Sequence, residues 1–206
     1  ADHGDPALYG FDPIQFYVSA YVPGMLGEGT EIRVGRLYCP WGMESLEAVS
    51  TPMITRSYAF NACPPFTHSG VGLYTTFNKE WSGMFMAVNG HDISFGAAAQ
   101  GWRGVAGVKW TSPDEGKDTV QMSTSLGRGA FNAGAPYVAS TVGLATEPLG
   151  RNNFNAFDLV YQHFFNPVFS YQMEAIYAYQ TAAPNLFSAD GFGNANWFAA
   201  AHYLFY

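Results

Sequence analysis

The residue types that carry out covalent chemistry in enzymes do not form a recognisable active-site motif in this chain. The sequence contains no Gly-x-Ser-x-Gly nucleophile elbow, no phosphate loop ending in Gly-Lys-Ser or Gly-Lys-Thr, no His-Glu-x-x-His and no Cys-x-x-Cys. We therefore expect no enzymatic activity, no metal ion and no cofactor. The five histidines lack the spacing of metal ligands and are expected to be structural or to lie at a rim: His3, His68, His91, His163 and His202.

The charged residues that could act on a ligand lie in segments where polar and apolar residues alternate. In an extended chain such alternation places the charges on one face and the apolar side chains on the other. Arg36 is out of phase with Arg33, and a β-bulge would bring both to the same face. These charges either set the ion preference of a watery lumen or form an ion-pair network that fills a narrow interior. The candidates are Arg33, Arg36, Arg103, Lys109, Asp158 and Glu174.

The elements that must position these charges are β-strands. The pattern is clearest in residues 156–180, where aromatic and polar residues alternate and Asn166-Pro167 divides the segment into a tight hairpin. Residues 137–144 are a further candidate strand. The predicted strands are residues 14–22, 31–38, 70–78, 81–89, 102–111 and 118–126, the two halves of the 156–180 hairpin, and residues 196–206.

The composition favours strands that cross a lipid bilayer. Only 12% of the residues are charged, against about 25% in a typical soluble domain, and 17% are aromatic. No apolar run approaches the about 18 residues of a membrane helix, whereas strands of about 9 to 11 residues match a tilted membrane strand. We therefore expect an all-β, antiparallel, up-and-down transmembrane β-barrel, or a large part of one. A soluble all-β domain with the same alternation is the alternative.

The predicted connections alternate between short and long. Short turns fall near residues 26, 79, 114 and 166, and long loops fall near residues 52, 95, 140 and 187. Bacterial outer-membrane barrels have this asymmetry, with short periplasmic turns and long outer loops. The strand number of these barrels is even, whereas nine strands are predicted here. The odd number indicates a segment of a longer barrel, a miscounted strand or closure through an oligomer.

Charge and cysteine content limit the partners and the chemistry further. The net charge is −7 and no run of Lys or Arg occurs, so no nucleic-acid partner is expected. Because the chain begins without Met or a signal segment, we expect residues 1–206 to be a mature form or a fragment, with one barrel domain that is incomplete at one or both ends. Cys39 and Cys63 could form a disulfide in an oxidising compartment, or both could stay reduced.

Residues 31–72 add evidence of another kind. The runs EIRVGRLYCPWGMES and SYAFNACPPFTHSGVG resemble the second strand and first loop of the putative β-barrel porin family described as OmpL-like. Members of that family are generally longer, and their further strands would follow the position of Tyr206. The positions that carry the resemblance are Gly35, Arg36, Gly42, Glu44, Pro65, Phe66, Thr67 and His68.

The resemblance implies a porin of the bacterial outer membrane that lets small hydrophilic solutes or ions diffuse passively. Its partners would be the outer-membrane lipid bilayer, the solutes and, as a candidate, further copies of the same chain. One of the long loops could fold inward as a constriction. The alternative function is a secreted or surface-exposed soluble β-sandwich that binds a ligand through its long loops. A barrel enzyme ranks last because no nucleophile and base can be paired.

Overall fold

A computed structural model describes the chain in six main stretches separated by gaps. These are residues 14–44, 55–60 without residue 58, 66–89, 102–127, 154–184 and 192–206. Within these residues no helix is long and apolar enough to cross a membrane.

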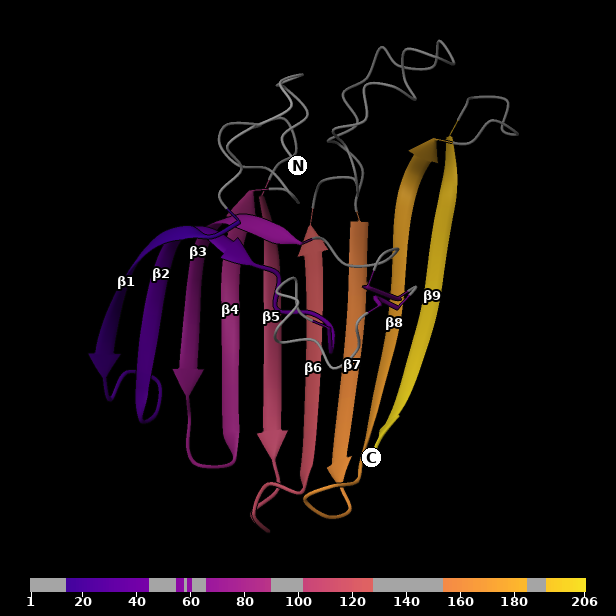
Figure 1. Ribbon diagram of the computed structural model, residues 1–206. Coiled ribbons are helices and arrows are strands. Elements are labelled where there is room, and N and C mark those ends of the chain that lie inside the picture. Colours follow the sequence, from indigo (N-terminus) through magenta and orange to yellow (C-terminus); the bar gives the residue numbers. More distant parts are fainter. Residues whose placement is uncertain are drawn as a thin grey trace, which may run out of the picture.

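The described residues form one antiparallel sheet of nine strands in which every strand pairs with its neighbours in the sequence. Figure 1 shows this up-and-down order as a continuous succession of colours across the sheet. The prediction of an all-β, antiparallel, up-and-down fold is confirmed. The strands are β1 (Phe16–Pro23), β2 (Gly29–Tyr38), β3 (Thr67–Thr76), β4 (Trp81–Asn89), β5 (Trp102–Thr111), β6 (Asp118–Gly127), β7 (Phe154–Phe164), β8 (Ser170–Pro184) and β9 (Phe192–Phe205).

The last two strands extend further toward the long loops than the sequence pattern indicates. Pairing between β8 and β9 continues past Gln180 after a register shift between Gln180 and Ala183, and ends at Pro184 opposite Phe192. Such an irregularity changes the phase of a strand. Alternation in the sequence therefore ends at the irregularity, although the pairing continues beyond it.

The short connections all lie at one end of the sheet and the long ones at the other (Figure 1). Asparagine side chains hold two of the tight turns, because Asn78 Oδ1 accepts the backbone N–H groups of Glu80 and Trp81, each at 2.9 Å. Asn166 Oδ1 accepts N–H groups in the same way in the β7–β8 turn, as expected of asparagine in turns. The observed placement agrees with the predicted alternation of loop lengths.

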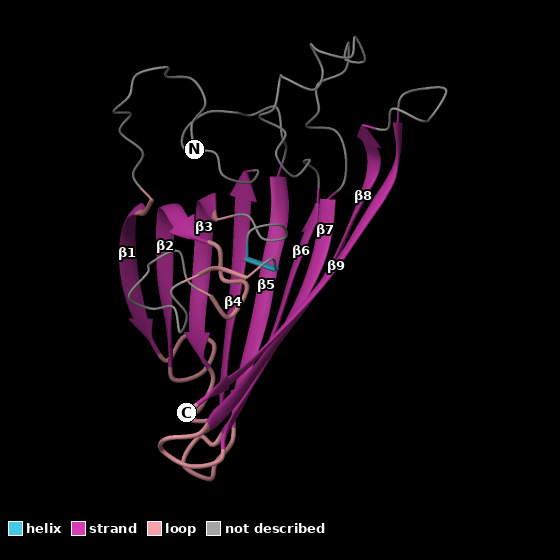
Figure 2. Ribbon diagram, turned by 45° about the vertical axis from the view of Figure 1, so that its right-hand side comes forward, coloured by secondary structure: helices cyan, strands magenta, loops and turns pink. Residues whose placement is uncertain are grey.

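The sheet is curved but not closed within the described residues. Figure 2 shows it curling around a hollow, and the strand order begins at β1 and ends at β9 with no pairing between these two edges. The backbone groups along the two edges therefore lack partners in the sheet. Barrel closure requires pairing partners for both edges.

The two faces of the sheet differ in chemistry. We call the concave face the inner face and the convex face the outer face. The outer face carries exposed apolar side chains at matched positions on neighbouring strands, such as Val34 opposite Val71. On the inner face Met86 and Val105 pair directly, are fully buried and form a small apolar cluster with Leu37 and Val88.

Candidate functional site

The long connection between β2 and β3 is the candidate functional element. We call residues 39–66 the plug; of these the structure describes 39–44, 55–57, 59–60 and 66. The plug leaves and rejoins the sheet at adjacent points, because the Cys39 backbone N–H donates to the Phe66 carbonyl oxygen at 3.0 Å. Figure 2 shows its described parts inside the hollow of the curved sheet. This loop folds inward.

Two carboxylates on β7 and β8 hold the first described part of the plug, residues 39–44. The Gly42 N–H donates to Asp158 Oδ2 at 3.0 Å, and the Met43 N–H donates to Glu174 Oε2 at 3.2 Å. Asp158 is 3% exposed and Glu174 is 1% exposed, so both carboxylates are buried beneath the plug. Their other oxygens, Asp158 Oδ1 and Glu174 Oε1, have no hydrogen-bond partner in the part of the chain that the structure describes. Neither carboxylate forms an ion pair with any side chain in the described ranges.

The backbone at Gly42 requires glycine for two reasons. Its φ of +84° lies in the left-handed region that side chains other than glycine rarely adopt. A Cβ atom at this position would also lie 3.0 Å from Glu174 Oε1. Glycine therefore allows the chain to turn directly over the two carboxylates.

A third carboxylate connects two of the described parts of the plug, residues 39–44 and 55–57. Glu44 is buried and accepts the Ser57 backbone N–H on both of its oxygens, at 3.0 and 3.1 Å. The Ser57 hydroxyl also donates to Glu44, and it accepts the Phe60 N–H at 3.1 Å. The plug is therefore tied to itself as well as to the sheet.

Small residues on β7, β8 and β9 make room for the apolar side chains of the plug. Trp41 is buried against Ala156 and Ala178, and Ala59 packs beside Ile176. On the other side of the plug, Gln121 Nε2 donates to the Pro40 carbonyl oxygen at 2.9 Å. The contact thus combines apolar packing with hydrogen bonds from β6, β7 and β8.

The charges predicted from alternation are distributed over the inner face. Pairing places Arg33, Arg103 and Lys109 on the same face as Asp158 and Glu174. The two carboxylates hold the plug, and the three cations lie elsewhere on the face. Whether these residues line a water-filled pore stays a prediction.

Arg33 has its own set of neighbours on β1, β2 and β3. Its Nη2 forms an ion pair with Glu31 Oε2 at 2.7 Å. Its guanidinium carbon lies 4.3 Å from the ring centre of Tyr74 and 5.1 Å from that of Tyr17. This cation–π arrangement holds the guanidinium in place.

The expected β-bulge between Arg33 and Arg36 is absent, and the place of Arg36 in a pore lining stays a prediction. Pairing runs through Arg33, Gly35 and Arg36 without a register shift, so the structure has no bulge between the two arginines, and Arg36 is buried at 2% exposure. The Arg36 Nε donates to the buried Thr67 Oγ1 at 3.2 Å. Gly35 preserves the register because a Cβ atom there would lie only 2.2 Å from the Phe16 carbonyl oxygen. Close approach of β1 thus explains the glycine.

Most positions of the family-like motif have a structural role at the base of the plug. Phe66 packs against Phe60 with ring centres 5.3 Å apart, and the buried His68 pairs with Leu37 across β2 and β3. Gly42, Glu44 and Thr67 make the contacts given above. Pro65 and Cys63 lie outside the described residues, so the Cys39–Cys63 disulfide stays a prediction.

Sequence reasoning did not identify Ser57, Gln121 or Glu31 as functional residues. Ser57 and Gln121 contact residues far away in the sequence, and no local pattern indicates these contacts. Glu31 had a usable signal, because residues i and i+2 on a strand share a face and Arg33 is its ion-pair partner. No cluster of His, Cys, Asp and Glu able to hold a metal ion occurs in the described ranges.

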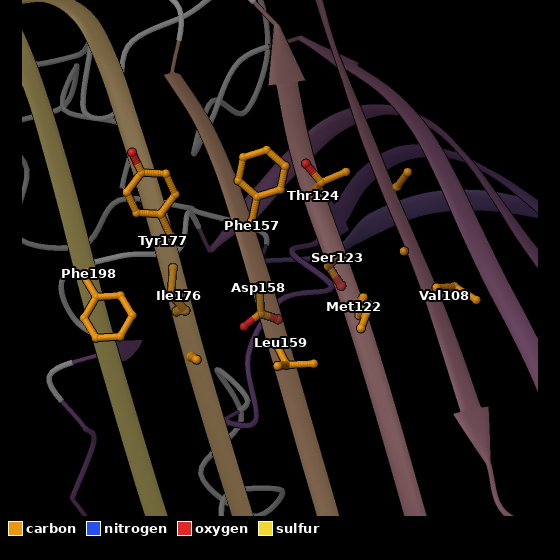
Figure 3. A pocket seen from close by; sticks show the side chains of 13 residues that line it. Val108, Met122, Ser123, Thr124, Phe157, Asp158, Leu159, Ile176, Tyr177 and Phe198 are labelled. Atoms are coloured by element: carbon orange, nitrogen blue, oxygen red, sulfur yellow. The ribbon is translucent and has the colours of Figure 1, made fainter.

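The outer face behind the plug is apolar and shallowly grooved. Figure 3 shows the rings of Phe157, Tyr177 and Phe198 on the neighbouring strands β7, β8 and β9, with Leu159 and Met122 nearby. The groove has a volume of about 600 Å³. All three rings are exposed to the surroundings of the protein.

The chain matches the model of a known protein family. The family described as "Putative beta-barrel porin-2, OmpL-like" matches residues 7–206. No curated protein and no solved structure matches the chain significantly.

Proposed function

The chain belongs to the OmpL-like β-barrel porin family, and from this membership we propose that it is an outer-membrane porin through which small hydrophilic solutes diffuse passively. The observation that carries this proposal is the plug, held inside a curved sheet whose outer face is apolar. The proposed localisation is the bacterial outer membrane, and the proposed partners are its lipids and the solutes.

The outer face supports contact with lipid. Its exposed side chains include Val18, Phe85, Met122, Phe157 and Phe198, which come from strands across the whole sheet. An apolar face of this extent is costly in water and is favourable against acyl chains. The soluble sandwich alternative requires a second sheet to cover such a face, and the described strands form a single sheet.

The inner face supports a restricted passage. The described plug residues pack against β7, β8 and β9 and contact β6 through Gln121. We refer to the part of the inner face along β1 to β5 as the open side. Arg33 and Lys109 lie on that open side, whereas Glu44, Asp158 and Glu174 are buried at the plug. Passage would depend on the width left by the plug and on the field of the exposed charges, with no covalent step.

The decisive first test is heat-modifiability followed by conductance. The chain is refolded in detergent micelles, and its gel mobility in SDS is compared with and without boiling. We expect a heat-dependent shift and discrete conductance steps in planar bilayers, because a closed membrane barrel resists SDS until it is heated. A monomeric, β-rich protein that stays soluble without detergent and shows no shift would contradict the proposal.

A further inference from the structure

A hollow of about 410 Å³ lies on the open side of the inner face, next to the plug residue Pro40. We call it the chamber. It is formed by strands β1 to β6 and lies toward their short-turn end. Its chemically relevant lining residues are Tyr21, Glu31, Tyr74, Lys109, Gln121 and Ser123.

Glycines shape the chamber wall. The Tyr21 hydroxyl lies only 2.0 Å from where a Cβ atom of Gly29 would be, so this glycine makes room for the phenol. A Cβ atom on Gly107 would lie 2.7 Å from Met84 Cε and 3.1 Å from Ser123 Oγ. Larger residues at either position would displace the side chains that line the chamber.

The only carboxylate in the described chamber lining is already neutralised. Glu31 pairs with Arg33 at 2.7 Å, and Arg33 in turn lies over the Tyr74 ring. This ion pair leaves the Glu31 charge compensated. The chamber therefore has little attraction for a cation.

Lys109 and Ser123 have unused hydrogen-bonding capacity. Lys109 is exposed and makes no ion pair or hydrogen bond with the described part of the chain; pairing places it between Ser82 and Gln121. The Ser123 hydroxyl is buried and has no hydrogen-bond partner among the described residues. An unpaired ammonium group and an unsatisfied hydroxyl in one hollow favour a ligand with both an anionic group and hydroxyl groups.

We propose that the chamber is a binding subsite for a small sugar acid, a ligand with one carboxylate on a hydroxylated ring. Lys109 binds the carboxylate, and Ser123 and the side-chain oxygen of Gln121, whose Nε2 already donates to Pro40, bind the hydroxyl groups. The exposed Tyr21 ring contacts the apolar face of the sugar. This inference rests on the proposed function, because it places the subsite on the diffusion path beside the plug.

The test uses glucuronate as the probe and does not depend on conduction. Binding to the refolded full chain in detergent micelles is measured by calorimetry at constant ionic strength. Lys109→Gln should weaken binding by about 10- to 100-fold, because a charge-assisted hydrogen bond is lost. Lys109→Arg should retain most of the affinity. Lys117→Gln, in the β5–β6 turn outside the chamber lining, is the matched control and should bind as the parent chain does.

Several outcomes would overturn the subsite. These are equal glucuronate affinity in Lys109→Gln and the parent chain, equal loss in Lys117→Gln, or binding of neutral glucose as tight as that of glucuronate. A parallel bilayer measurement separates this inference from the porin proposal. Binding that depends on Lys109 without any conductance would contradict the porin and leave the subsite standing. Conductance with no binding of glucuronate would contradict the subsite and leave the porin proposal standing.

Discussion

At the level of single residues, Gly42 is a described plug position that does not tolerate a side chain. Its positive φ and its proximity to Glu174 both exclude a side chain. The Gly42 N–H also donates the hydrogen bond that Asp158 accepts. Backbone conformation and anchoring thus depend on the same residue.

Gly42→Ala should loosen the plug and raise single-channel conductance. The left-handed conformation costs a non-glycine residue about 1 to 2 kcal/mol, and the added methyl group contacts Glu174 as well. Gly24→Ala is the matched control: its φ of +70° imposes similar strain in the β1–β2 turn, with no atom within 4 Å of the new Cβ. Equal conductance in both variants would mean that the fit of Gly42 against Glu174 does not control the position of the plug.

Asp158 can be tested by separating its charge from its role as an acceptor. Asp158→Asn keeps an oxygen that can accept the Gly42 N–H, so the plug should stay in place. Asp158→Ala leaves that N–H unpaired, at a cost of about 1 to 3 kcal/mol if it stays buried. Limited proteolysis of the plug should therefore be faster in the Ala variant than in the Asn variant. Equal rates would argue against this anchor.

At the level of elements, the plug and the sheet are separable. The ends of the plug meet at the hydrogen bond between Cys39 and Phe66, so a short connection can span the same gap. The nine strands pair in sequence order without using the plug as a strand. The sheet should therefore form without it.

Replacing residues 40–65 with a short Gly-Asn linker should leave the heat-dependent gel shift intact and raise conductance severalfold. The reason is that the plug occupies the hollow, while strand pairing provides the sheet. Circular dichroism checks that the strand content persists. Loss of the gel shift would show instead that the plug is required for folding of the barrel.

At the level of the whole molecule, the curvature of the sheet decides which face turns toward the hollow and which turns toward the surroundings of the protein. Leu159 and Val160 are adjacent on β7, but Leu159 lies on the outer face, and Val160 pairs with Glu174 on the inner face. The unpaired edges β1 and β9 need partners in a membrane, from further chain or from a second copy.

Leu159→Lys should destabilise the protein in lipid vesicles by about 2 to 4 kcal/mol, the cost of a lysine facing lipid near the midplane. Val160→Lys, one residue away, should cost much less because its side chain faces the hollow and the Glu174 carboxylate. Urea unfolding in vesicles measures both free energies of unfolding. A larger cost at Val160 than at Leu159 would reverse the assignment of the two faces.

The sequence by itself determined the strands, their antiparallel order, the alternation of loop lengths and the parity of the charges on β2, β5, β7 and β8. These features follow from local periodicity and turn residues, which depend on neighbours in the chain. The bulge expected between Arg33 and Arg36 is absent, because Gly35 lets β1 and β2 approach closely without a register shift.

Only the tertiary structure decided that the long β2–β3 connection folds into the hollow, and that Asp158 and Glu174 hold backbone N–H groups there. It also showed that Trp197 and Ala199 of the last strand face the plug side, although they form an apolar stripe in the sequence. The physical reason is that alternation defines two faces but does not say which is concave. Contacts such as Gly42 with Asp158 join residues that only the curled sheet brings together.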